Sequence, residues 1–282
     1  MKISPIYFVN GKHLPKNKAF IGVLDIGLLR AYGVFDFLVT YKGNPFLLDE
    51  HTNRLFNSAS AIGLDIGKTE KQIKSIVLNT LNKNRWRGEK TVRIVVTGGV
   101  GENTITPSSQ STIIVIIDHK HNYPRHLYEN GIKTITFNHV RSQALVKSLE
   151  YSDAIKALQI ARRKGALEVI YIDKSTDRVS EATTSNLFIV KKGKIFTPKD
   201  NVLNGITRDT VIMLLKQTNP VVQKIINRKE LFSADEVFIT ASNKEVMPVV
   251  AIDDQMIGNG KVGDITKEVM DTFKVFIQKG KW

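Results

Sequence analysis

The chain has 282 residues, of which 42% are hydrophobic and 24% charged, and its formal net charge is +14. This length can bury a substantial core and favours two domains over one, and the composition is that of a folded globular protein rather than a disordered one. The sequence contains no cysteine, which excludes disulfides, thiolate zinc sites and cysteine nucleophiles.

The excess of positive charge raises nucleic acid as a partner, because basic proteins neutralise phosphates. The lysines are nonetheless scattered in ones and twos, with no run of five or more and no interleaved aromatic residues. The N-terminus lacks the apolar core of a signal peptide, and no stretch approaches the roughly 18 apolar residues of a spanning helix. We therefore expect a cytoplasmic protein that binds neither nucleic acid nor membrane.

The first part of the chain predicts a β-hairpin followed by two helices. Asn10-Gly11 is a strong two-residue turn signal between short extended segments. The spacing of apolar residues predicts a helix with Asp49 as its N-cap and with its end at Gly63. Thr69 and Gln72 form a capping-box pattern before a second helix.

Two β-branched runs, Thr91–Thr97 and Thr112–Ile117, predict central strands of a first domain. The segment 118–128 contains three histidines and a proline without apolar periodicity, which favours a linker over a metal site. We therefore divide the chain into an N-terminal domain of residues 1–117, a linker of residues 118–128 and a C-terminal domain of residues 129–282, and we expect no bound metal.

The C-terminal domain shows strand and helix patterns in an irregular order. The predicted strands and helices are Lys133–Phe137, a helix at about Ser152–Lys164, Glu168–Ile172, Asn186–Val190, Ile195–Thr197, a helix from about Thr207, Glu236–Thr240 and a helix from about Asp264. This order fits an α+β arrangement of two domains better than a regular βαβ alternation.

Four separated segments carry the chemical signal, although each alone is ordinary. They are a lysine after an apolar stretch (residues 146–149), small polar residues with one acid before a strand (180–188), a glycine turn at a helix start (203–209) and a strand ending in hydroxyl residues (234–242). A helix start offers free N–H groups and a dipole that favour an anion.

In this order and spacing the segments resemble the fold-type IV family of pyridoxal-phosphate (PLP) enzymes. The family includes D-amino-acid aminotransferases, branched-chain aminotransferases and aminodeoxychorismate lyases. The resemblance runs from residues 25–29 to residues 260–263. It implies a smaller N-terminal α/β sandwich domain, a larger C-terminal barrel-like domain, PLP as cofactor and a homodimer.

The resemblance also implies roles for individual residues. Lys147 matches the lysine that binds PLP covalently and then moves the substrate proton. Glu181 matches the acid that faces the pyridine nitrogen and keeps it protonated. Arg54 matches the arginine that binds the phosphate, whose geometry a guanidinium suits.

Four further residues match the phosphate site of the family. Ile206 and Thr207 would donate backbone N–H groups, Ser242 a hydroxyl and Asn243 its backbone N–H. The phosphate would thus be held from several directions.

The substrate is less determined, because the chain departs from each subfamily. The segment Lys147-Ser148-Leu149-Glu150-Tyr151 is closer to D-amino-acid enzymes and lyases than to branched-chain enzymes. The loop Gly98–Gly101, however, lacks the Arg-x-His pair with which familiar D-amino-acid enzymes bind the α-carboxylate, and it is closer to the branched-chain type.

Another cation must then bind the carboxylate, because an unpaired carboxylate in a dry pocket is costly. Arg30, Arg93 and Lys244 lie in pocket-forming segments and are the candidates. A basic pocket suits an amino-acid carboxylate and the two carboxylates of 2-oxoglutarate. The favoured activity is therefore transamination of D-amino acids; a branched-chain L-amino-acid aminotransferase and an aminodeoxychorismate lyase are the alternatives.

Overall fold

The computed structural model describes residues 4–107, 109–280 and 282. The described residues form two compact units. The first comprises residues up to His121, the segment Val146–Glu150 and Trp282, and the second comprises the rest. Within the described ranges, no helix has the length and apolar character needed to cross a bilayer.

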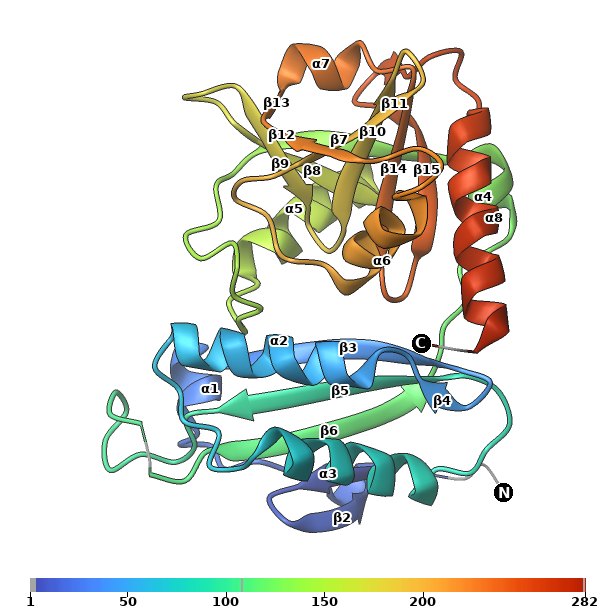
Figure 1. Ribbon diagram of the computed structural model, residues 1–282. Coiled ribbons are helices and arrows are strands. Elements are labelled where there is room, and N and C mark those ends of the chain that lie inside the picture. The colour runs from blue at the N-terminus through green and yellow to red at the C-terminus, as the bar shows by residue number, and fades with distance from the viewer. Residues whose placement is uncertain (1–3, 108, 281) are drawn as a thin grey trace. The chain divides into compact units, whose positions relative to one another are not determined.

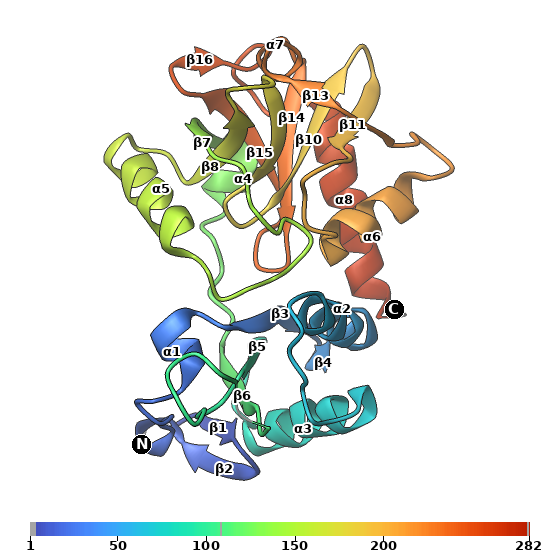
Figure 2. The same cartoon turned by 90° about the vertical axis from the view of Figure 1, so that its left-hand side faces the viewer.

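The first unit is a six-stranded antiparallel sheet with the helices α2 and α3 on one face (Figures 1 and 2). Its order is β2-β1-β6-β5-β3-β4. The bounds are β1 Ile6–Val9, β2 Lys12–Pro15, β3 Gly33–Tyr41, β4 Asn44–Pro45, β5 Lys90–Thr97, β6 Thr112–His119, α1 Ile26–Arg30, α2 Leu48–Ala61 and α3 Glu70–Lys83, with a short 3-10 turn at Lys16–Lys18.

Strand β3 separates two environments in this unit. Because successive side chains of a strand point to opposite faces, Val34 and Leu38 enter the core with α2 and α3, whereas Phe35 and Phe37 lie on the other face. The segment Val146–Glu150 joins the start of β3: Phe35 N donates to the Lys147 carbonyl oxygen at 2.9 Å, and Val34 and Ser148 form an antiparallel bridge. This pairing places Lys147 in the first unit, whereas the sequence-based division had put it in the second.

The second unit contains a ten-stranded mixed sheet whose path runs β12-β11-β10-β14-β15-β7-β8-β9-β13, with β16 paired to β15. The strand bounds are β7 Ile132–Asn138, β8 Glu168–Asp173, β9 Arg178–Ala182, β10 Asn186–Lys191, β11 Lys194–Pro198, β12 Val222–Lys224, β13 Ile226–Asn227, β14 Glu236–Ala241, β15 Glu245–Ile252 and β16 Gln255–Met256.

The two ends of this path, β12 and β13, are separated only by Ile225 in the chain. The sheet therefore curls until its first and last strands are neighbours in the chain, and side chains from β7, β8, β9, β10, β13, β14 and β15 share one core. Among the described strands this sheet does not close by hydrogen bonds between β12 and β13. The expected barrel-like domain is thus a curled, open sheet.

Five helices of the described chain belong to this unit. They are α4 His126–Asn130, α5 Ser152–Arg163, α6 Ile206–Leu215, α7 Arg228–Phe232 and α8 Asp264–Lys279. Ala157 and Ala161 of α5 pack against β7 and β8, and α6 and α8 contact each other and β14 (Figure 1).

The structure confirms most of the predicted elements and corrects some details. The hairpin and the Thr69–Gln72 capping box are present. The prediction of Asp49 as N-cap is wrong, because α2 begins at Leu48 with Leu47 as N-cap in a left-handed conformation and Asp49 lies in the first turn. The predicted linker begins within β6 and ends within α4.

Candidate active site

Lys147 is anchored through its backbone and lies against an aromatic ring. Its N–H donates to Ser58 Oγ of α2 at 3.2 Å, and its carbonyl oxygen accepts from Phe35. Its Nζ lies 4.8 Å from the centroid of the Phe35 ring. The half-buried side chain therefore lies on the face of the sheet that α2 and α3 do not cover.

Arg93 contacts the same ring as Lys147. It stands opposite Phe37 in the pairing of β5 with β3, and its guanidinium carbon lies 5.3 Å from the centroids of both Phe35 and Phe37. The two aromatic faces orient the guanidinium. Two of the residues nominated from the sequence are thus brought together.

Arg54 is held by a buried carboxylate. Its Nε and Nη2 donate to the two oxygens of Asp36, each at 2.8 Å, in a bidentate pair. Asp36 is fully buried and also contacts His51 Nδ1 at 2.6 Å. This arrangement orients the guanidinium of Arg54 at the first turns of α2.

The charges of this cluster follow from their surroundings. Burial by itself raises the pKa of Asp36, but the Arg54 guanidinium and the His51 ring outweigh it and hold that pKa well below its usual range. Burial lowers the pKa of His51 despite the neighbouring Asp36. His51 is therefore neutral near pH 7 and donates its Nδ1 proton to the Asp36 carboxylate.

Glu181, in the second unit, is buried and oriented by three donors. Arg141 Nη1 contacts Oε1 at 2.6 Å, while Asn186 Nδ2 and the backbone N–H of Leu203 donate to Oε2 at 3.1 and 3.0 Å. Asn186 Nδ2 also donates to the Leu203 carbonyl oxygen at 2.8 Å. The acid is therefore connected directly to the loop that leads into α6.

The start of α6 forms a tight cradle. Gly205 is its N-cap, and a Cβ at this position would lie 1.8 Å from Asn186 Oδ1, so only glycine fits without displacing Asn186. Ile206 and Thr207 form the first turn and are buried. Ser242 and Asn243 lie in the turn between β14 and β15 and are half-buried.

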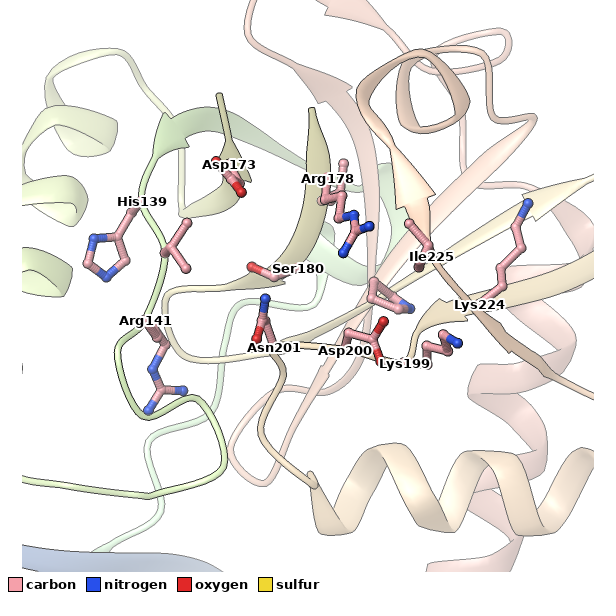
Figure 3. A pocket seen from close by; sticks show the side chains of 13 residues that line it. His139, Arg141, Asp173, Arg178, Ser180, Lys199, Asp200, Asn201, Lys224 and Ile225 are labelled. Carbon is pink, nitrogen blue, oxygen red and sulfur yellow. The ribbon is translucent and has the colours of Figure 1, made fainter. Parts of the chain in front are cut away.

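A shallow pocket borders the Glu181 segment (Figure 3). Its lining includes Arg141, Ser180 and Asn201. The enclosed volume is about 20 Å³, which holds roughly one water molecule. This pocket is too small for an amino-acid substrate.

The other two nominated cations lie elsewhere. Arg30 is exposed at the end of α1 and donates to Thr104 Oγ1 at 3.2 Å. Lys244 is only 3% exposed, and its ammonium lies 2.9 Å from Oε1 of buried Glu168. The sequence nominated Lys244 for the substrate carboxylate, but the structure engages its ammonium with Glu168.

The sequence did not predict the partners of two nominated residues: Asp36, which binds Arg54, and Arg141, which binds Glu181. Asp36 stands within an apolar strand, where an acid requires a cation or hydrogen-bond donors, so its sequence did carry a signal. Arg141 precedes Glu181 by 40 residues in a polar segment after β7, and no local pattern distinguishes it from a solvated arginine.

Comparisons of the sequence and of the structure with known proteins both find aminotransferases. The sequence model of the family described as amino-transferase class IV matches residues 33–252. A provisionally named branched-chain-amino-acid aminotransferase of Methanocaldococcus jannaschii is 38% identical, over 95% of this chain and 94% of its own. A D-alanine aminotransferase of Staphylococcus haemolyticus is 31% identical, over 96% and 97%.

A solved structure has the same fold over nearly the whole chain. The branched-chain aminotransferase of the archaeon Thermoproteus uzoniensis with norvaline superimposes with a TM-score of 0.90 at 26% identity, covering 99% of this chain and 96% of the other.

We expect the Asp36→Asn variant to lose about 3–5 kcal/mol of unfolding free energy at pH 7, because Arg54 is left without its buried counter-charge. The stabilisation from a carboxyl with a lowered pKa is present above its unfolded pKa of about 3.9 and is lost as the pH falls below it. The difference between wild type and variant in urea unfolding should therefore shrink in acid. Asp118→Asn, a partly exposed acid of the same unit, is the control and should change stability by less than about 1 kcal/mol.

Proposed function

Because the chain belongs to the class IV aminotransferases, which are PLP-dependent transaminases, we propose that it moves amino groups from D-amino acids to a 2-oxo acid such as 2-oxoglutarate. The expected family and cofactor are thereby confirmed. The observation that carries the substrate proposal is Arg93 on the same ring as Lys147.

The residues present fit PLP. When bound, PLP supplies an electron sink for negative charge at the substrate Cα. Lys147 would hold it covalently, and the released amine of Lys147 would move the proton from the substrate Cα to the C4′ carbon of the cofactor. Glu181, a buried acid held by three donors, would keep the pyridine nitrogen protonated.

The phosphate has binding groups of the right chemistry. Arg54 offers a guanidinium whose orientation Asp36 fixes. The first turn of α6 offers the N–H groups of Ile206 and Thr207 beside Gly205, where a larger residue would displace Asn186. The Ser242 hydroxyl and the Asn243 backbone N–H would complete the set.

The substrate carboxylate requires a cation that the glycine loop lacks. A Cβ at Gly98 would lie 2.6 Å from Ile26 Cδ1 and 2.7 Å from Tyr32 Cδ1, so packing closes this position to an arginine side chain. Arg93 would then bind the α-carboxylate, with Arg30 as the second cation. Such a basic pocket suits the α-carboxylate of an amino acid and the two carboxylates of 2-oxoglutarate better than it suits an aliphatic side chain.

A branched-chain L-amino-acid aminotransferase is the second candidate. The observation in its favour is the glycine loop itself, together with the names of the Methanocaldococcus jannaschii and Thermoproteus uzoniensis proteins. An assay of D-alanine and L-leucine with 2-oxoglutarate, of D-glutamate with pyruvate and of aminodeoxychorismate without an acceptor decides between the candidates. Transfer from the D-isomers alone supports the proposal, transfer from L-leucine alone rejects it, and release of pyruvate from aminodeoxychorismate alone indicates the lyase.

We also propose that the protein is a homodimer. Two segments of the first unit are joined by the hydrogen bond from Ile26 N to the Gly99 carbonyl oxygen at 3.0 Å, and together they expose large apolar side chains: Phe20, Val23, Leu24, Leu28, Val100 and Ile105. Several large apolar side chains exposed on two adjoining segments are typical of an interaction site. A second copy is the proposed occupant, and Arg30 would then serve the neighbouring subunit's site.

Borohydride reduction of the PLP-bound protein should label Lys147, because reduction converts its covalent link to the cofactor into a stable one. Peptide mapping by mass spectrometry identifies the labelled residue. A label on any other lysine contradicts the assignment. Arg54→Ala should weaken PLP binding, measured by equilibrium dialysis, while Lys147 remains the residue that is labelled when PLP is in excess.

Arg93→Ala and Arg30→Ala should each lower kcat/KM for D-amino acids roughly ten- to a hundredfold, because each removes a charge-assisted bond to the carboxylate. PLP affinity should be largely unchanged, since the phosphate is anchored by other residues. Arg87→Ala, an exposed arginine of the same unit, is the control and should behave as wild type. If both variants keep wild-type kcat/KM, the proposed carboxylate site is wrong.

Light scattering of the wild type should give the mass of a dimer. Val23→Lys and Leu28→Lys should shift the mass towards the monomer, because they place charge on the proposed interface. Leu78→Lys, at an exposed apolar position of α3 in the same unit, should leave the dimer intact. A wild-type monomer with full turnover would reject the dimer.

A further inference from the structure

The second unit contains a buried ion pair that the chemistry described above does not use. Glu168, the first residue of β8, is 1% exposed, and Lys244, in the turn between β14 and β15, is 3% exposed. Their Oε1 and Nζ atoms are 2.9 Å apart. Burial of two charges at this depth requires that both be satisfied by close partners.

Both members of the pair are charged at neutral pH. Burial by itself raises the pKa of Glu168, but the Lys244 ammonium and the hydroxyls of Thr183 and Thr184 outweigh it, and the pKa lies below its usual range. Burial by itself lowers the pKa of Lys244, but the Glu168 carboxylate outweighs it, so that pKa is raised.

The pair holds the turn between β9 and β10. The hydroxyls of Thr183 and Thr184 donate to Glu168, and Ser185 Oγ donates to Glu168 Oε1 at 3.2 Å. Lys244 Nζ donates to Thr184 Oγ1 at 2.7 Å. Three consecutive side chains of the turn are thereby fixed by one buried acid and its lysine.

This turn connects two residues of the Glu181 cluster. Glu181 lies on β9, just before the turn, and Asn186, which donates to Glu181, is the first residue of β10. The turn closes with a hydrogen bond from Ala182 N to the Ser185 carbonyl oxygen at 2.8 Å. A rotation of the turn would therefore change the direction of the Glu181 carboxylate.

We propose that Lys244 is a positioning residue. Paired with Glu168, it fixes the turn of residues 183–185 and thereby orients the carboxylate of Glu181. It also connects this turn to the loop that carries Ser242 and Asn243. The proposal deepens the function proposed above and rests on the role of Glu181 in it. Apolar residues of similar size often replace a buried ion pair without loss of stability. The charges therefore serve to orient the turn, because the carboxylate accepts hydrogen bonds from hydroxyl groups that an apolar side chain cannot bind.

The test compares Lys244→Met with the double variant Lys244→Met/Glu168→Met in the PLP-bound protein. Lys244→Met should lower the Tm, because Glu168 is left as an unpaired buried charge. The double variant should recover most of the lost Tm, since both charges are gone. In both variants the amides of residues 182–186 should exchange hydrogen faster than in wild type, because the turn hydroxyls have lost their fixed acceptor.

The function of the pair is measured by spectroscopy and kinetics on the same variants. The visible absorbance of bound PLP, followed against pH, should shift in the direction that Glu181→Gln produces, and kcat should fall by up to about a hundredfold, as misplacement of a catalytic group by a distant change can cause. Lys191→Met, which removes an ion pair with Asp235 at the other end of β10, is the matched control and should keep the wild-type spectrum, exchange and kcat.

A double variant with recovered Tm and with wild-type exchange, spectrum and kcat overturns the proposal, because the pair would then serve stability alone. Faster amide hydrogen exchange in residues 182–186 with an unchanged PLP absorbance spectrum also overturns it, since the orientation of Glu181 would then not depend on the turn. If the wild type binds no PLP, the function proposed above fails, and the exchange of the Glu181 and Asn186 amides still decides whether the pair directs the acid.

Discussion

The organisation of both units depends on one constraint: a carboxylate removed from water must be paired or hydrogen-bonded. Asp36, Glu168 and Glu181 are each at most 3% exposed. Each carboxylate is bound by several hydrogen-bond donors. These donors include Arg54 and Lys244, which the sequence analysis proposed for cofactor and substrate binding. The buried acids therefore fix the orientation of the cations and loops that bind them.

The neighbours of each acid come from elements that the sheets bring together. Asp36 lies on the covered face of β3, where α2 supplies Arg54. Glu181 lies on β9 and reaches the loop before α6 through Asn186. Two of these donors, Arg54 and Asn186, lie on a helix and a strand, and donors on packed elements keep their geometry without reorganisation, which favours electrostatic catalysis.

Proteins of the same family that are 31% and 38% identical to this chain carry names for different amino acids, although the fold is shared at a TM-score of 0.90 with a branched-chain enzyme. In this chain Ile26 and Tyr32 pack against Gly98 and leave no room for a side chain there. Arg93 is exposed and lies on β5 between the buried residues Val92 and Ile94. Function within such a family has to be argued from individual side chains at the site, because the fold is shared.

The sequence by itself determined the features whose physical cause is local. The Asn10-Gly11 turn, the Thr69–Gln72 capping box and the amphipathic helix α5 depend on residues within a few positions of one another. The ordered set of motifs determined the family, and with it the curled C-terminal sheet. Strands β3 and β15 were not predicted; both are largely buried and show no regular alternation of apolar and polar residues.

Only the tertiary structure decided the partners of the charged residues. Lys244 meets Glu168 across 76 positions of the chain, and Glu181 meets Arg141 across 40. Lys147 belongs to the first unit because its backbone pairs with β3. No local sequence pattern predicts this contact. The physical reason is the same in each case: local propensity depends on neighbours in the chain, whereas burial and charge pairing depend on neighbours in space.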